Sequence, residues 1–426
     1  MTAVGRVGTH GVLRQELGRV FDQSAGTIDV EQLVGAPIEI RTYPFESAHS
    51  DVHPADDYAS ADPTARALFA YYLEHSPHSN RHLFRALQIA DRAIDTNRSF
   101  RYAVFSPKRS PGAERFSNAI VLMHGLNERF WTKYLPWAAR LAELRGVPVI
   151  LFPIAFHMNR APEVWARPRE MIAVARERQT LFPGLAASSF ANVALSHRVQ
   201  FAPHRFVTSG LQTYLDLIDL CRAVRDGAHP GIAAGARVDL FGYSIGCLLV
   251  QMLMMADPDG LFGSSHAVLF CGGSILEHAR PVSKAIVDEE AHRGLTHYLD
   301  RVARDPSATL GAIFDVAGWH SDVRLFTSLA FAGCHRDERE RAARRVRDRM
   351  TVLCMARDRV FPPESLNASW GTGEQSLLPV RTYDPEFDYS HEQPFPSGDE
   401  DGRVGACFDR VFTDAAGGLE GIRTAG

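Results

Sequence analysis

Short apolar runs alternate with helix-type segments from about residue 100 onwards. Three runs are too short for buried helices and are rich in β-branched or aromatic residues, which predicts buried strands: Ala119–Met123, Val238–Phe241 and Ala267–Cys271. Further strands are predicted at 101–106, 147–152, 351–355 and 380–383. Leu135–Arg145 and Gln212–Arg225 place apolar residues at helical spacing. This alternation predicts the α/β fold class, a mostly parallel sheet flanked by helices on both faces.

Two long segments, 156–208 and 276–349, interrupt the alternation. They are helical by pattern and too long for ordinary connections between helices and strands, so we predict helical caps inserted into a main domain that spans 96–415. Residues 1–95 form a mostly helical N-terminal extension, with a short strand at 37–43 and a helical stretch at 64–94, and 416–426 form a tail. The extension could pack on the core, enlarge the cap or mediate a homodimer.

Composition narrows the class of protein. Apolar residues make up 45% of the 426 residues and charged residues 23%, as in soluble globular proteins. A net charge of −4 provides no broad positive surface for nucleic acid. The N-terminus lacks the apolar region of a signal peptide, and no run of about 18 apolar residues predicts a membrane span, so we expect a cytoplasmic protein.

Metal and redox chemistry find little support in the sequence. The six cysteines are far apart and show no C-x-x-C spacing, so we interpret them as reduced thiols. Histidines and aspartates are frequent between His49 and Asp57, and histidines recur between His75 and His82. They lie among Ser, Pro and Asn, which favours a solvated loop over a metal site.

The stretch Gly242-Tyr-Ser-Ile-Gly246 carries the strongest chemical signal. A predicted strand enters it and a helix-type run, Leu248–Met255, leaves it. A serine on so sharp a turn projects its hydroxyl above the sheet, and flanking glycines let strand and helix approach without Cβ clashes. The N–H groups at the start of the helix favour negative charge at the same place. A structural turn with an inert serine is the alternative, so the rest of the chain has to supply partners.

A base and an acid follow at the ends of later predicted strands. Serine needs a neighbouring base to become a nucleophile, and the base needs an acid to orient it. Asp358 follows the strand at 351–355, and His391 follows the strand at 380–383. The carboxyl ends of parallel strands share one sheet edge, so both side chains are expected beside Ser244. Asp388 and Glu392 flank His391 as competing acids, but Asp358 is preferred because its strand fixes it.

With these residues the chain resembles the α/β-hydrolase superfamily over about residues 100–155, 209–275 and 350–412. The order Ser244, Asp358, His391 is similar to its nucleophile, acid and histidine, and Gly242-Tyr-Ser-Ile-Gly246 resembles its nucleophile elbow. Cys247 departs mildly from the glycine found in many members. His124-Gly125 resembles the oxyanion loop, which implies that the backbone N–H groups of Leu126 and Ile245 hold the oxyanion.

Substrate contacts are less sharply predicted. Candidates are His124, Tyr243, His157 and Arg160, and a structural role for His124 is equally compatible with its position. His157, His204 and His320 lie in the caps without the strand-end placement that the base needs. The first cap holds seven arginines and three glutamates. This surplus could bind an anionic substrate group, although the pattern favours a solvated helical face.

The residues and the resemblance together predict a serine hydrolase that cleaves an acyl bond, most simply a carboxylic ester of a small or medium-sized molecule, without metal or organic cofactor. An acyltransferase or a carbon–carbon bond hydrolase or lyase would use the same three residues. A non-catalytic binding protein that retains the fold is the alternative from another class.

Overall fold

The computed structural model describes residues 28–29, 38–54, 63–77, 80–110, 112–305, 320–397 and 402–421. Within these residues nine strands form one sheet in the order β1-β2-β3-β5-β4-β6-β7-β8-β9. The strands are β1 (Ile28–Asp29), β2 (Ile38–Glu46), β3 (Ser99–Pro107), β4 (Phe116–Met123), β5 (Val149–Leu151), β6 (Ile232–Tyr243), β7 (Ala267–Phe270), β8 (Met350–Met355) and β9 (Val380–Tyr383). The six strands β4 to β9 run parallel to their neighbours among themselves, and β1 to β3 are paired antiparallel.

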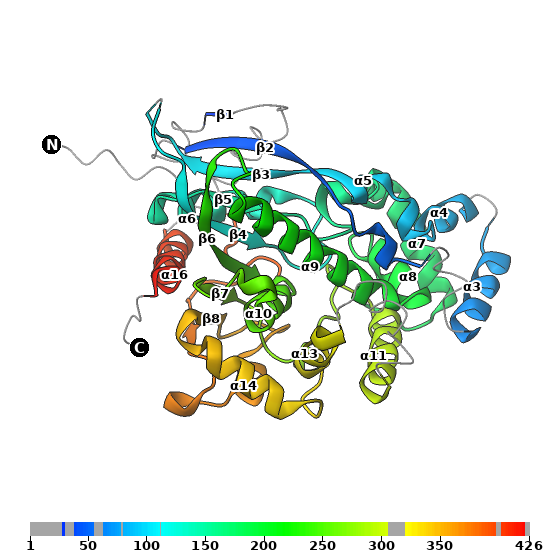
Figure 1. Ribbon diagram of the computed structural model, residues 1–426. Coiled ribbons are helices and arrows are strands. Elements are labelled where there is room, and N and C mark those ends of the chain that lie inside the picture. Colours follow the sequence, from blue (N-terminus) through cyan, green and yellow to red (C-terminus); the bar gives the residue numbers. More distant parts are fainter. Residues whose placement is uncertain are drawn as a thin grey trace.

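Helices cover both faces of the sheet, as the alternation of strands and helices predicts (Figure 1). On one face lie α6 (Leu135–Arg145) and α16 (Arg403–Glu420); on the other lie α9 (His204–Arg225), α10 (Gly246–Ala256), α13 (His320–Ala330) and α14 (Arg336–Val346). Side chains of β4 alternate between the faces: Val121 packs with α9 and α10, whereas Ile120 and Leu122 pack with α6 and α16. The α/β fold class predicted from the sequence is confirmed.

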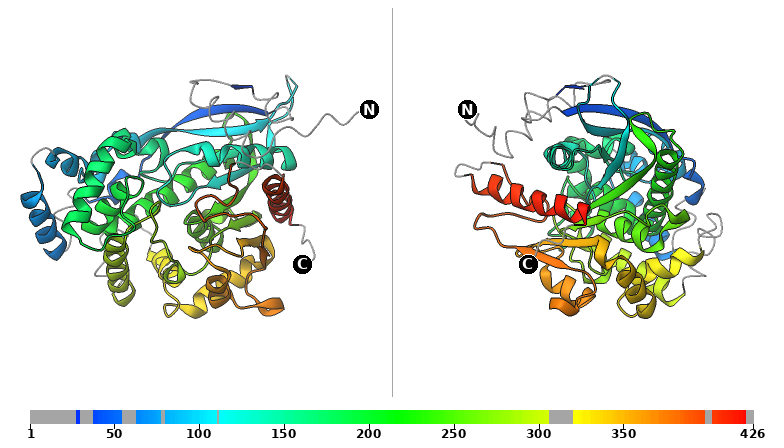
Figure 2. Two further views of the ribbon diagram at one scale, coloured as in Figure 1. Left: turned by 180° about the vertical axis from the view of Figure 1, so that it is seen from behind. Right: turned by 60° about the vertical axis from the view of Figure 1, so that its left-hand side comes forward.

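The segment before residue 96 is part of this architecture. Strand β2 pairs with β3 along its whole length, from Ile38 opposite Pro107 to Glu46 opposite Ser99. Helices α3 (Pro63–His75) and α4 (Arg81–Leu87) pack with α7 (Pro168–Leu181) and α8 (Val193–Phe201) of the first predicted cap around a separate apolar cluster. α11 (Glu289–Arg304) of the second predicted cap lies against α8, so these helices gather beyond one end of the sheet (Figure 2). The extension therefore both joins the sheet and packs on helices of the predicted caps.

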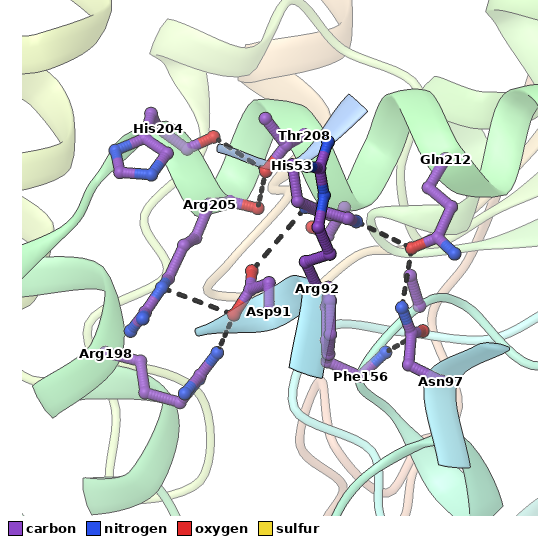
Figure 3. A network of polar contacts seen from close by, with 12 residues as sticks. His53, Asp91, Arg92, Asn97, Phe156, Arg198, His204, Arg205, Thr208 and Gln212 are labelled. Carbon is purple, nitrogen blue, oxygen red and sulfur yellow. Dashed lines mark hydrogen bonds and ion pairs between the residues drawn. The ribbon is translucent and has the colours of Figure 1, made fainter. Parts of the chain in front are cut away.

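A buried polar network ties this extension to α8 and α9 (Figure 3). The carboxylate of Asp91 contacts the guanidinium groups of Arg198 and Arg205 and the ring of His53. His53 also contacts the Gln212 amide oxygen at 2.7 Å, and that oxygen accepts a hydrogen bond from Asn97. Buried charges are stable when they are paired in this way. His53, predicted to lie in a solvated loop, is buried against α9, and residues 55–60 of that loop lie outside the described residues.

Several boundaries differ from the prediction. α6 and β9 have the predicted bounds, whereas α9 begins at His204 and not at Gln212. Because α9 is continuous, it crosses residue 208, where we placed the end of the first cap. α16 likewise extends to Glu420, into the predicted tail, because its apolar residues continue to pack on the sheet; Leu419 is fully buried. α15 (Pro363–Trp370) and α5 (Asp95–Arg98) complete the helices described.

Candidate functional site

Ser244 lies on the turn between β6 and α10. Its φ of 55° falls in the left-handed region, where residues other than glycine are strained. A Cβ on Gly242 would lie 2.8 Å from the Cys247 Cα, and one on Gly246 would lie 2.7 Å from the Met123 carbonyl oxygen. No side chain fits at either place without a shift of the backbone. The glycines on both sides therefore allow the close packing that holds Ser244 at the carboxyl end of β6.

Three of the predicted side chains form one chain of hydrogen bonds at this edge of the sheet. The Ser244 Oγ lies 2.8 Å from the Nε2 of His391, and the Nδ1 of His391 lies 2.8 Å from the Oδ2 of Asp358. A carboxylate can only accept, so Nδ1 carries the hydrogen and Nε2 accepts from the serine hydroxyl. All three side chains are buried. This arrangement prepares the imidazole to take a proton from Ser244.

Asp358 is fixed by its own backbone environment. Its Oδ1 accepts hydrogen bonds from the N–H groups of Val360 at 2.8 Å and Phe361 at 3.0 Å. Burial acts to raise the pKa of the Asp358 carboxyl, but His391 and the two amides outweigh it, and the pKa lies below its ordinary value. The group is thus held as a carboxylate. The competing acids lie elsewhere: Asp388 is fully exposed, and Glu392 accepts from the Ser283 hydroxyl at 2.8 Å.

The predicted oxyanion loop lies beside the serine turn. Within the described part of the chain, neither the Leu126 nor the Ile245 backbone N–H donates to a protein acceptor. A Cβ on Gly125 would lie 3.3 Å from the Ser244 Cβ, which shows how closely the loop approaches the turn. Both amides, beside the serine turn, are thus without a protein acceptor among the described residues.

His124 has a structural place in this loop. Its Nδ1 donates to the Gly125 carbonyl at 2.8 Å, and its Nε2 accepts from the Ile154 N–H at 2.9 Å. The ring is fully buried, and burial holds its pKa well below the ordinary value, so it is neutral. With both ring nitrogens occupied by backbone groups, His124 joins the loop to the chain after β5 and is not available for the substrate contact we considered.

Two cavities of similar size meet at the loop 126–132. The first, of about 560 Å³, is lined by Ser244, His391 and Leu126 among others. The second, of about 550 Å³, is lined by aromatic side chains from the loop and the first predicted cap: Phe130, Trp131, Phe156, Trp165 and Phe206. A narrow third cavity of about 80 Å³ lies among apolar side chains of α9 and α10, next to Ile245. Leu126 lines all three, so it stands at their junction.

The other residues predicted to contact the substrate differ in whether they line a cavity. His157 lines the aromatic and the narrow cavity, as a substrate contact would. Its Nδ1 donates to the Ala155 carbonyl at 2.9 Å, and burial lowers its pKa to about 4, so the ring is neutral. Arg160 lines none of the three cavities; it is fully buried and bonded to Asp216 at 2.8 Å, which corrects the contact predicted for it. The ring of Tyr243 stacks on that of His391, and Tyr243 lines the serine cavity.

Several residues of the site had no signal in the sequence. Arg129 and Phe130 line both large cavities, and Lys133 lies under the loop that carries His391, where its Nζ donates to the Glu392 carbonyl at 3.1 Å. They follow the predicted oxyanion loop by a few positions, and only that proximity could have identified them as residues of the site. His204 is buried at the start of α9, and the side chain of His320 lies outside the described residues.

The rest of the described structure bears on metal binding, thiol chemistry and membrane insertion. Among the described residues, no group of three or more His, Cys, Asp or Glu side chains could hold a metal ion. The six cysteines carry free thiols. No helix in the described ranges has the length and apolar character needed to cross a membrane.

A mostly parallel sheet with helices on both faces and a Gly-Tyr-Ser-Ile-Gly turn at its carboxyl edge define a protein of the α/β-hydrolase fold. The chain belongs to a particular family within that description: residues 12–419 match the Family of unknown function (DUF6051). No curated protein matches the chain in sequence.

Solved structures with some likeness to the chain include two esterases. Carboxyl esterase 2 of the mycorrhizal fungus Tuber melanosporum is 12% identical, with a TM-score of 0.37 over 76% of this chain and 82% of the esterase. A carboxylesterase of Lactobacillus plantarum is 13% identical, with a TM-score of 0.40 over 77% of this chain and 95% of that enzyme. A puromycin-hydrolyzing peptidase of Mycobacterium tuberculosis is 16% identical, with a TM-score of 0.37, and the match covers 77% of this chain and 38% of the peptidase.

Proposed function

We propose that the protein is a serine hydrolase that cleaves a carboxylic ester through an acyl-enzyme on Ser244. One observation carries the proposal: the hydrogen-bonded chain from Ser244 Oγ through His391 to Asp358. A chance turn with an inert serine would not need a buried imidazole at 2.8 Å, nor a carboxylate aligned behind it.

Each of these groups has a part in the proposed reaction. His391 Nε2 takes the hydroxyl proton as the Ser244 Oγ attacks the carbonyl carbon, and Asp358 stabilises the imidazolium that forms. The carbonyl oxygen becomes an oxyanion, which accepts hydrogen bonds from the Leu126 and Ile245 amides. The alcohol leaves with the proton from His391. Water then attacks the acyl-enzyme with His391 as base, and Ser244 regains its proton as the acid departs.

The cavities support a substrate with a short apolar part and a larger part. The narrow cavity beside Ile245 is lined by Leu248, Leu249 and Met252, and it suits a short apolar group on one side of the scissile bond. The serine cavity and the aromatic cavity leave room for a larger group on the other side of the scissile bond.

Labelling and turnover together test the proposal. We expect the wild-type protein to react with a fluorophosphonate probe and to hydrolyse p-nitrophenyl butyrate. Ser244→Ala should abolish labelling and lower turnover by about a thousandfold or more, with an unchanged circular dichroism spectrum. Full labelling of the variant, or a wild-type protein that neither labels nor turns over any acyl ester, would contradict it. Matched Ser283→Ala, at a serine bonded to Glu392 and outside the hydrogen-bonded chain, should label normally.

A further inference from the structure

The loop that leads from Leu126 to α6 carries an arginine whose charge is not neutralised by any residue that the structure describes. Arg129 lines both the serine cavity and the aromatic cavity. Its Nη1 donates to the Trp165 carbonyl, a neutral acceptor. Within the described residues no carboxylate lies within ion-pair distance of it, and its side chain is partly exposed.

The other cations that line these cavities all have carboxylate partners. Lys133 pairs with Glu128, and Arg198 and Arg205 share Asp91, as Figure 3 shows for the two arginines. Arg160, Arg178 and Arg167 of the first cap are likewise paired, with Asp216, Asp288 and Glu163. Most arginines of the first predicted cap are therefore paired with carboxylates of the protein. Among the described cavity-lining cations, Arg129 alone is left to meet a ligand anion.

The surroundings of Arg129 make such a ligand favourable. Burial lowers the pKa of its guanidinium to about 10, because the charged form has lost part of its hydration and gained no counter-charge. An incoming carboxylate would restore both, through charge-assisted hydrogen bonds to the donors that remain. Glu392, which lines the serine cavity together with Arg129, is held as a carboxylate, because its own backbone N–H and Ser283 lower its pKa against the effect of burial. An anionic group is thus repelled by Glu392 and attracted by Arg129.

We propose that Arg129 is the specificity-determining residue of the site, and that it binds the carboxylate of an acidic ester whose apolar or aromatic body lies in the adjoining cavity. The inference rests on the proposed esterase function for its substrate, but the binding step itself does not need turnover. The lining by Phe130, Trp165 and Phe206 favours an aryl or alkyl body. The reactive carbonyl then reaches Ser244 while the acid end is held by Arg129.

Binding to an inactive protein tests the subsite alone. In the Ser244→Ala background, calorimetric titration should show 4-phenylbutyrate binding about tenfold or more tightly than 4-phenylbutyramide. Arg129→Met in that background should remove the preference, and Arg129→Lys should retain part of it. Arg176→Met, at an exposed arginine of α7 that lines none of the three cavities, is the matched control and should change nothing. Equal affinity for acid and amide, or a preference that survives Arg129→Met, would overturn the proposal.

Turnover provides the second arm. With the active protein, p-nitrophenyl hemiglutarate should have a kcat/KM about tenfold or more above that of p-nitrophenyl hexanoate, and Arg129→Met should raise the KM for the hemiglutarate only. An unchanged ratio in the variant would refute the role of Arg129. If neither ester is cleaved while the carboxylate still binds in an Arg129-dependent manner, the hydrolase proposal fails and the anion subsite stands.

Discussion

Tyr243 contacts His391 through both its hydroxyl group and its ring. The phenol O–H donates to the backbone carbonyl of His391, and the two rings are stacked with centroids 5.4 Å apart and planes inclined by 16°. Tyr243 is almost fully buried, and it is the residue directly before Ser244. The turn that positions the proposed nucleophile therefore also positions the proposed base. Tyr243 thus helps to fix both partners of the hydrogen bond between Ser244 and His391.

We expect Tyr243→Phe to lower kcat with little change in KM. The variant keeps the stacked ring but leaves the His391 carbonyl without its donor, a loss of about 1 kcal/mol, so kcat should fall about fivefold to tenfold. Initial rates with p-nitrophenyl butyrate give both constants, and the labelling rate with a fluorophosphonate reports His391 positioning independently. A variant whose only change is a higher KM would point to the substrate contact predicted for Tyr243 from the sequence.

Gly246→Ala should disrupt the site by steric contact. The new Cβ would lie 2.7 Å from the Met123 carbonyl oxygen and 2.8 Å from the His124 carbonyl oxygen. Since neither backbone atom can rotate away, the turn and the predicted oxyanion loop must separate. We expect a loss of about 1–3 kcal/mol in the free energy of unfolding and a fall in kcat of about a hundredfold. Denaturant unfolding and ester turnover measure the two effects.

Gly333→Ala is the matched control, because a Cβ there meets no atom within 4 Å and the residue is exposed. It should leave stability and activity within error of the wild type. If Gly246→Ala behaves in the same way, the close approach of the turn to the predicted oxyanion loop is not required for activity.

His157 should make stability depend on pH. Its pKa is about 4 in the folded protein because burial disfavours the charged ring, against about 6.5 in the unfolded chain. Between these values only the unfolded chain binds the proton, so stability falls as pH decreases from about 6.5 to about 4. From pH 7 to pH 5 this amounts to about 2 kcal/mol for His157.

The test compares urea unfolding of the wild type and His157→Gln at pH 7 and pH 5. The wild type should lose about 2 kcal/mol more than the variant between the two values. His124 remains in both proteins and contributes equally, so it cancels in the comparison. His75→Gln, at an exposed position, should follow the wild type. Equal pH dependence for wild type and His157→Gln would show that the His157 ring is not held neutral.

The sequence predicts the three hydrogen-bonded residues better than their surroundings, for a physical reason. Ser244, Asp358 and His391 each follow a strand whose apolar pattern is local, and parallel strands bring their carboxyl ends to one edge. Arg160 shows the limit: its partner Asp216 lies on α9, and no local pattern pairs them. Arg129 shows the same limit, because only the final packing of its loop leaves it without a carboxylate partner among the described residues. The pairing of β2 with β3 depends on contacts of equally long range.

Arg160→Met should lower the free energy of unfolding without altering substrate preference. The guanidinium and the Asp216 carboxylate are both fully buried, and burial lowers the pKa of Arg160 and raises that of Asp216. Removing one partner leaves the other charge buried and unpaired, which costs about 3–5 kcal/mol.

The double variant Arg160→Met, Asp216→Asn removes that charge and should recover part of the loss, since the new amide oxygen can keep the hydrogen bond from Ser47. Denaturant midpoints give the coupling, and an unchanged ratio of kcat/KM for hemiglutarate and hexanoate esters is expected in every folded variant. A selective loss of hemiglutarate cleavage in Arg160→Met would instead place Arg160 in contact with the substrate.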